Sequence, residues 1–142
     1  TISTAETVAS AQKDITLLNE ARLSTSVMVW NISPLEPGYL NCDVTNNGNG
    51  VVADLPHMDV FSYDETNRYI RYRYDAGGTD TPGTWYDLIP YERDYVHTGE
   101  LDPGDIMRIK LVYPTGITIT APARVTLVTY NGVSATNWTP WP

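Results

Sequence analysis

The chain has 142 residues, of which 42% are hydrophobic and 18% are charged, a composition that predicts one folded globular domain rather than a disordered chain. Nine basic residues against 17 acidic ones give a formal net charge of −8. This balance argues against nucleic acid as a partner, because binding to phosphates needs clustered Lys and Arg. No apolar stretch approaches the roughly 20 residues that cross a bilayer. Because the chain begins at Thr1 without an initiator Met, we expect a segment upstream of it.

The first part of the chain carries a helical pattern. Ser3 and Glu6 have the spacing of a capping box, and an apolar stripe then recurs at steps of three and four residues, which predicts a helix over residues 4–22. The stripe consists of Val8, Ala11, Ile15 and Leu18. It fits a helix packed on its own sheet, and equally one that continues an upstream segment or pairs with a neighbour. We therefore divide the chain into a helical part, residues 1–24, and a β domain, residues 25–142.

From residue 26 onward the apolar period changes to two, which predicts strands. The predicted strands cover residues 27–32, 39–45, 51–55, 58–63, 69–74, 85–89, 91–97, 106–113, 117–120 and 124–130. Turn residues separate them, among them NNGNG at 46–50, LDPGD at 101–105 and the hairpin signal Asn-Gly at 131–132. With about seven to nine of these ten segments forming strands joined by short turns, the pattern predicts an all-β sandwich with Greek-key connections and one N-terminal helix. A closed barrel also fits the pattern.

Candidate catalytic and metal-binding groups are few. His57 and His97 lie far apart in the sequence and lack the spacing of metal ligands. Glu92 and Asp94 share one face of a predicted strand, as in a glycosidase or cation site, but also as on any solvated surface. Residues 75–80 resemble a calcium loop superficially, without its alternating oxygen ligands or closing Glu. We therefore predict no enzyme activity, no metal site and no cofactor.

Single residues add little about function. Cys42 is the one cysteine of the chain, so an internal disulfide is excluded, and its place in an alternating apolar run predicts that it is buried. Asn31 and Asn137 begin Asn-X-Ser/Thr sequons, each followed by proline. Such sequons accept glycans in exported proteins, and chance explains them equally well.

Residues 68–74 form a basic and aromatic island, RYIRYRY, in an acidic chain. Alternation places Tyr69, Arg71 and Arg73 on one face of a strand and Ile70, Tyr72 and Tyr74 on the other. Arg and Tyr are enriched at binding hot spots, so Arg71, Tyr72 and Arg73 are predicted to contact a partner. The arginines also fit cross-strand pairing with neighbouring carboxylates. A sugar-stacking platform is a separate hypothesis, formed by Trp85, Tyr86, Tyr91 and Tyr95.

The run ITIT at residues 117–120 is prone to form a strand and carries no charge. Pro114 and Pro122 bracket it, which predicts an edge strand because proline cannot donate to a ladder. An edge without charged residues is either covered or paired with a neighbour. We therefore predict a homodimer whose interface contains Ile117 and Ile119.

The turn motifs occur in a characteristic order: a strand that ends in an Asn-X-Gly turn at 46–48, LDPGD at 101–105 before a long strand, and a last strand that ends in Asn-Gly-Val at 131–133. In this the chain resembles the soluble domains of archaeal pilin-like proteins, over about its last hundred residues plus the helix. Among them it is most similar to the FlaF family of archaellum accessory proteins, ahead of the FlaG family and the archaellins.

This resemblance implies an immunoglobulin-like β-sandwich in the space under the S-layer, anchored in the cytoplasmic membrane by a hydrophobic N-terminal helix. It implies a domain that binds S-layer protein, associates with other archaellum subunits such as FlaG-like proteins, forms a dimer and serves as the static part of a rotary motor. The chain departs from the family in two respects, because the membrane helix is absent from it and residues 75–83 have no matching segment. A filament subunit and a secreted carbohydrate-binding module remain alternatives.

Overall fold

The computed structural model describes residues 24–33, 35–88 and 99–139, which contain eight strands and one short 3-10 helix. The elements in chain order are β1 (Val27–Trp30), β2 (Tyr39–Asn46), η1 (Leu55–His57), β3 (Asp59–Asp64), β4 (Arg68–Tyr74), β5 (Thr84–Asp87), β6 (Ile106–Val112), β7 (Ala123–Val128) and β8 (Ser134–Thr139). Within this part of the chain, no helix has the length and apolar character that crossing a membrane requires. The predicted helix over residues 4–22 and the predicted strand over 91–97 lie outside the described residues.

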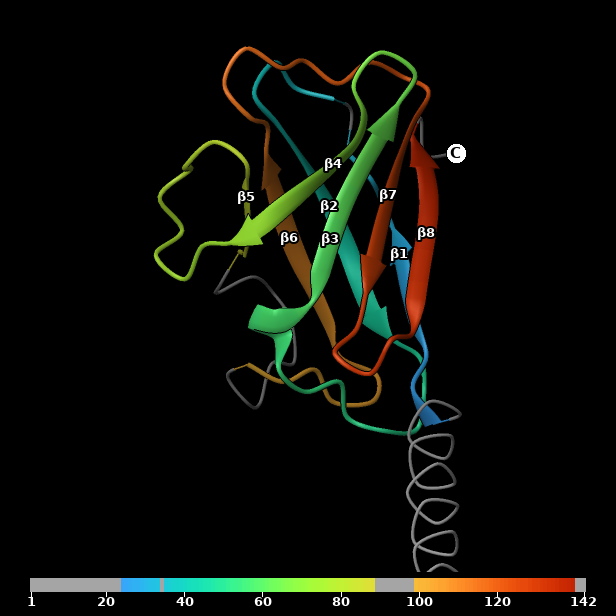
Figure 1. The fold of residues 1–142 in the computed structure, drawn as a ribbon. Helices are drawn as coiled ribbons and strands as arrows, with labels where there is room; N and C mark the ends of the chain where they lie inside the picture. The colour runs from blue at the N-terminus through green and yellow to red at the C-terminus, as the bar shows by residue number, and fades with distance from the viewer. Residues whose placement is uncertain (1–23, 34, 89–98, 140–142) are drawn as a thin grey trace, which may run out of the picture.

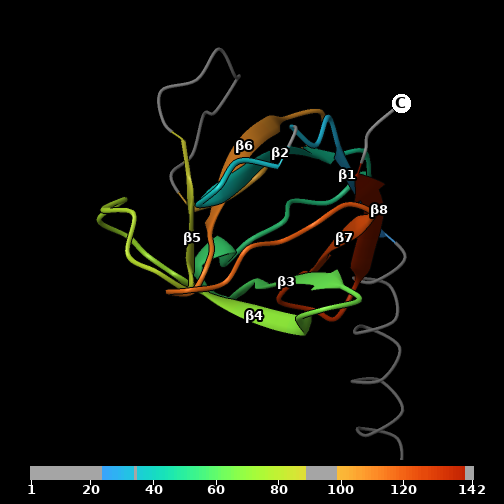
Figure 2. The ribbon, with the colours of Figure 1, turned by 90° about the horizontal axis from the view of Figure 1, so that it is seen from above.

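The strands form two layers, β1-β2-β6-β5 and β4-β3-β7-β8 (Figures 1 and 2). Strand β4 joins them, because it pairs antiparallel with β3 and then, at Arg73 and Tyr74, parallel with β5. On the opposite side, Asn137 of β8 donates from its Nδ2 to the carbonyl oxygen of Val29 in β1 at 3.0 Å. The prediction of an all-β, immunoglobulin-like sandwich is confirmed, in a form that is nearly closed into a barrel. Long connections place β2 beside β6 and β3 beside β7, as in a Greek key.

Alternation along the strands builds the core between the layers. In β2, β3, β6 and β7, inward side chains are buried and most outward ones are partly exposed, which is the pattern that the sequence predicts. Cys42 is fully buried among them, as expected. The largest fully buried side chains are Trp85, Tyr72, Leu40, Leu101, Ile109, Leu111 and Leu127.

Two predicted strands are wrong. Residues 51–55 contain only an isolated bridge between Val52 and Leu101. The run then breaks at Asp54, whose φ is 56°, and enters η1 at Leu55. Residues 117–120 form no strand either, because the N–H of Thr120 donates to the carboxylate of Asp64 at 3.0 Å rather than to a ladder.

The loss of this edge strand changes the setting of the predicted dimer contact. Ile119 is only 2% exposed and belongs to the core, and Ile117 is partly buried against it. The open edge with two outward isoleucines, from which we predicted the interface, is therefore not present in the fold. Homodimerisation itself stays a prediction.

Candidate functional site

The three turns that carry the family resemblance meet at one end of the sandwich, the lower end in Figure 1. Asn46 joins the first two: its Nδ2 donates to the carbonyl oxygens of Gly50 and Leu101, both at 2.8 Å. Its backbone carbonyl accepts from the N–H of Gly104 at 2.7 Å, and its own N–H donates to the carbonyl of Asp105 at 3.0 Å. A polar side chain that is fully buried here is thus fully used in joining two turns.

The chain enters the sandwich through residues 24–26, which we call the connecting segment. On one side, the N–H groups of Asn49 and Gly50 donate to the carbonyl of Ser24, and that of Asn47 donates to Ser26, each at 3.0 Å. These three bonds fix the segment against the turn at residues 46–50.

On the other side, the connecting segment contacts the β7–β8 turn. Asn131 Nδ2 donates to Thr25 Oγ1 at 2.9 Å, and Thr129 Oγ1 donates to Asn131 Oδ1 at 2.6 Å. All three side chains are buried, so these bonds are sheltered from competition by water. We call the two turns that hold the segment, residues 46–50 and 129–133, the clamp.

Glycine is required at position 48 because the backbone of the connecting segment lies very close to it, and not because of its backbone dihedral angles. A Cβ at this position would lie 2.5 Å from the carbonyl oxygen of Ser24 and 2.6 Å from the backbone nitrogen of Ser26. Glycine can take positive φ without strain, but neither Gly48 nor Gly50 does so. The missing side chain instead lets the turn lie directly on the connecting segment.

The basic island divides between two environments. Arg71 and Arg73 point outward and are exposed, as alternation predicts. Tyr72 is only 1% exposed; burial raises its pKa to about 12, and its hydroxyl pairs with Ser62 Oγ at 2.7 Å inside the core. Tyr72 is therefore not available to a partner, and its inclusion among the predicted contact residues is wrong.

Strand register extends this outward face beyond the island. Tyr69 of β4 lies opposite Tyr63 of β3, Tyr63 lies opposite Arg124 of β7, and Arg124 lies opposite Trp138 of β8. One row of three aromatic rings and one guanidinium thus crosses four strands. We call the outward side of β4, β3, β7 and β8 the arginine face.

Arg124 is the centre of the row. Its guanidinium carbon lies 4.7 Å from the ring centroid of Tyr63, 5.3 Å from that of Tyr69 and 5.2 Å from that of Trp138. Its Nη2 donates to the hydroxyl of Tyr69. Nothing in the local sequence pattern points to Arg124 and Trp138, because only the register of β3, β7 and β8 brings them to the island.

The arginines of this face differ in their partners. Arg71 Nη2 forms an exposed ion pair with Asp59 Oδ1 at 2.8 Å, which bears out cross-strand pairing for this residue. Arg68 Nη1 donates to the hydroxyl of Tyr63 at 3.2 Å. The guanidinium of Arg73 has no polar partner among the residues that the structure describes. The face therefore presents positive charge that the protein itself only partly neutralises.

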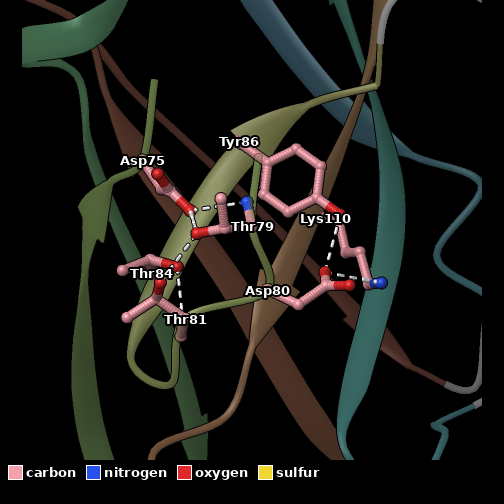
Figure 3. A network of polar contacts seen from close by, with 7 residues as sticks. All are labelled: Asp75, Thr79, Asp80, Thr81, Thr84, Tyr86 and Lys110. Atoms are coloured by element: carbon pink, nitrogen blue, oxygen red, sulfur yellow. Dashed lines mark hydrogen bonds and ion pairs between the residues drawn. The ribbon is translucent and has the colours of Figure 1, made fainter. Parts of the chain in front are cut away.

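A separate polar network fixes the loop of residues 75–83 to the other layer (Figure 3). Asp80 Oδ1 accepts from Lys110 Nζ at 2.8 Å and from the hydroxyl of Tyr86 at 2.6 Å, and these two hydrogen bonds lower the pKa of Asp80. The carboxylate of Asp75 accepts from the N–H and hydroxyl of Thr79 at 2.9 and 3.0 Å. This carboxylate therefore serves as an internal cap of its own loop, a role that differs from a calcium ligand.

The predicted sugar-stacking platform is wrong at Trp85, which lies in the core, and Tyr86 is held by Asp80. Tyr91 and Tyr95 lie outside the described residues. His57 is exposed and its Nδ1 pairs with Asp54 Oδ1 at 2.6 Å. The remaining candidates for chemistry, Glu92, Asp94 and His97, also lie outside the described residues.

The amide nitrogens of both sequons make hydrogen bonds within the domain. Asn31 Nδ2 donates to Asp43 Oδ2 at 2.9 Å. Asn137 Nδ2 donates to the carbonyl oxygen of Val29 and so joins β8 to β1. Attachment of a glycan to either nitrogen would disturb these contacts.

Known proteins resemble this chain in fold. No protein-family model and no curated protein matches the sequence. The archaellum periplasmic stator protein FlaG from Sulfolobus acidocaldarius is 16% identical, with a TM-score of 0.60 over 80% of this chain and 98% of that chain. The FlaF–FlaG stator complex of the same organism is 14% identical, with a TM-score of 0.59 over 79% and 86%.

The archaeal flagellum of Methanospirillum hungatei strain JF1 is 12% identical, with a TM-score of 0.63 over 96% of this chain and 77% of that chain. The resemblance that the turn motifs indicated is thereby confirmed at the level of the fold. The chain has the β-sandwich fold found in archaellum stator proteins and in the archaeal flagellum.

Proposed function

We propose that this chain is the extracytoplasmic domain of an archaellum accessory protein, which binds S-layer protein and anchors the static part of the motor. The observation that carries the proposal is the clamp. The three turns that mark the resemblance are far apart in the sequence. The first and the last of them hold the connecting segment, and the first also binds the second. The fold shared with stator proteins supports the same conclusion.

The clamp suits a part that bears load. A static anchor has to transmit force between what precedes residue 24 and the sandwich. Three backbone hydrogen bonds on one side of the connecting segment and a buried side-chain network on the other provide this coupling. The proposal includes a membrane helix upstream, continued by the apolar stripe of residues 8–18, as well as FlaG-like subunits and a second copy of the chain as partners.

The proposal also assigns no catalytic activity to the chain. The similar solved structures are stator and filament components of archaella, and a structural part needs a rigid, well-packed domain rather than a reactive cleft. Glu92 and Asp94 are the residues to test. Hydrolase turnover that is lost on changing either of them to Ala would contradict this assignment.

A retention experiment tests the proposed binding. The purified domain is immobilised, and S-layer protein solubilised from the host envelope is passed over it, with an unrelated acidic β-sandwich on a second column as the control. Retention by the domain alone is the expected result. S-layer protein that passes through both columns equally would contradict the proposal.

The match to the archaeal flagellum favours a second candidate function, that of a filament subunit. Shearing the cells separates the two. A filament subunit would be a major component of the sheared filaments, whereas an accessory protein stays with the cell bodies. We expect the chain in the cell-body fraction.

A further inference from the structure

The arginine face has a charge opposite to that of the chain as a whole. Arg71, Arg73 and Arg124 lie at outward positions, and Arg68, at the start of β4, reaches the face by donating to the hydroxyl of Tyr63. These are four of the nine basic residues in a chain with a net charge of −8. Among the outward positions of β4, β3, β7 and β8 as the structure describes them, Asp59 is the only carboxylate. An acidic surface is therefore attracted to this face and repelled by much of the remaining protein.

The face also supplies the residue types that dominate binding energy. Tyr69 is 63% exposed and Trp138 is 47% exposed, one at each end of the row, with Arg124 between them. Trp, Tyr and Arg are the residues most enriched at hot spots of protein interfaces. Because the aromatic rings hold the Arg124 guanidinium in place, it is ordered before any partner arrives, which lowers the entropy cost of binding.

We propose that the arginine face binds an acidic segment of a protein partner, with Arg124 as the central cation and Tyr69 and Trp138 as its apolar flanks. A guanidinium donates two parallel N–H hydrogen bonds to a carboxylate, while the methylene groups of Asp or Glu pack on the neighbouring rings. This inference rests on the proposed function, since it names the chemistry by which the domain recognises its envelope partner. It moves the centre of the site from the predicted Arg71–Arg73 island to Arg124.

The contacts of Arg124 favour a protein over a glycan. A sugar-stacking platform needs open ring faces, whereas here the guanidinium lies over all three rings of the row at 4.7 to 5.3 Å. The groups that stay exposed beside it are the side chains of Tyr69 and Trp138 and the guanidinium groups of Arg71 and Arg73. These suit carboxylates better than the faces of pyranose rings.

Binding of poly-L-glutamate to the purified domain, measured by titration calorimetry at low salt, tests the inference. Arg124→Gln should weaken binding about tenfold, because one charge-assisted contact contributes that much. The double variant Tyr69→Ala with Trp138→Ala should weaken it as well, and added salt should weaken it for every variant. Circular dichroism confirms that each variant is folded.

Two matched controls isolate the face. Lys110→Gln removes the same charge from the other layer, and Tyr130→Ala removes a ring that is 48% exposed in the β7–β8 turn. Both should bind poly-L-glutamate within twofold of the wild type. If Arg124→Gln and Lys110→Gln weakened binding of poly-L-glutamate equally, the binding would depend only on net charge, and the inference would be overturned.

Polygalacturonate, an anionic sugar polymer, is the competing probe. Tighter binding of polygalacturonate than of poly-L-glutamate, lost in Arg124→Gln, would make the face a glycan site and also overturn the inference. The outcome for the proposed function is separate. If poly-L-glutamate binds through Arg124 while the domain does not retain S-layer protein, the acidic-segment site stands and the proposed S-layer partner is wrong.

Discussion

Replacing Gly48 with alanine tests the clamp directly. The new Cβ would lie 2.5 and 2.6 Å from two backbone atoms of the connecting segment, and backbone cannot yield as a flexible side chain does. The turn and the segment must separate, which costs two or three of the hydrogen bonds made by Asn47, Asn49 and Gly50. At about 1 kcal/mol each, Gly48→Ala should destabilise the domain by about 2–3 kcal/mol and lower Tm by roughly 6–12 °C.

Gly38→Ala is the matched control, because a Cβ at Gly38 meets no atom within 4 Å. It should leave stability unchanged or raise it by up to about 1 kcal/mol, since alanine reduces the freedom of the unfolded chain. Urea unfolding followed by circular dichroism measures both variants, and hydrogen exchange at Asn49 and Gly50 reports on the clamp itself. Equal free energies of unfolding for the two variants would refute the close-approach argument.

Three further predictions concern buried groups. Burial alone raises the pKa of Asp64, but hydrogen bonds from the backbone and side chains of Thr120 and Asn67 outweigh it and hold this pKa below its usual value. Ionised Asp64 therefore stabilises the fold above about pH 4, and this contribution is lost as the pH falls through the lowered pKa. In the Asp64→Asn variant, the free energy of unfolding measured in urea should vary less with pH over that range. Ile119→Lys places an unpaired ammonium in the core, so thermal melting should show that the free energy of unfolding falls by about 3 kcal/mol or more. If light scattering instead showed that the wild type is a dimer and the variant a folded monomer, the edge interface would be supported. Burial raises the pKa of the Cys42 thiol, so a thiol reagent should label it only in denaturant, and rapid labelling of the native protein would contradict its burial.

Local patterns predicted the strands well wherever one side of the strand faces the core. In β2 and β6, alternation alone placed Leu40, Cys42, Ile109 and Leu111 inward, as the structure has them. The same rule separates the two sides of β4, and it already placed Tyr72 on the apolar side. The prediction that Tyr72 contacts a partner therefore contradicted the period of two, which correctly indicates that this side chain faces the core.

The errors arose where tertiary contacts outweigh local propensity. Residues 117–120 have strong strand propensity, yet the carboxylate of Asp64, 56 positions away from Thr120, binds the N–H that a strand would have used. The arginine face and the clamp could not be predicted from local sequence patterns for a related reason. Tyr69 and Arg124 are 55 positions apart, and Thr25 and Asn131 are 106 apart, so only the register of the sheet brings them together.

Swimming of the host cell most directly tests the claim that this domain anchors an archaellum motor. Cells with the gene disrupted should not swim, as tracked by light microscopy, and the wild-type gene or the Gly38→Ala variant should restore swimming. Gly48→Ala should restore it less, because the load path through residues 24–26 is weakened. Disrupted cells that swim at the speed of the wild type would contradict the account.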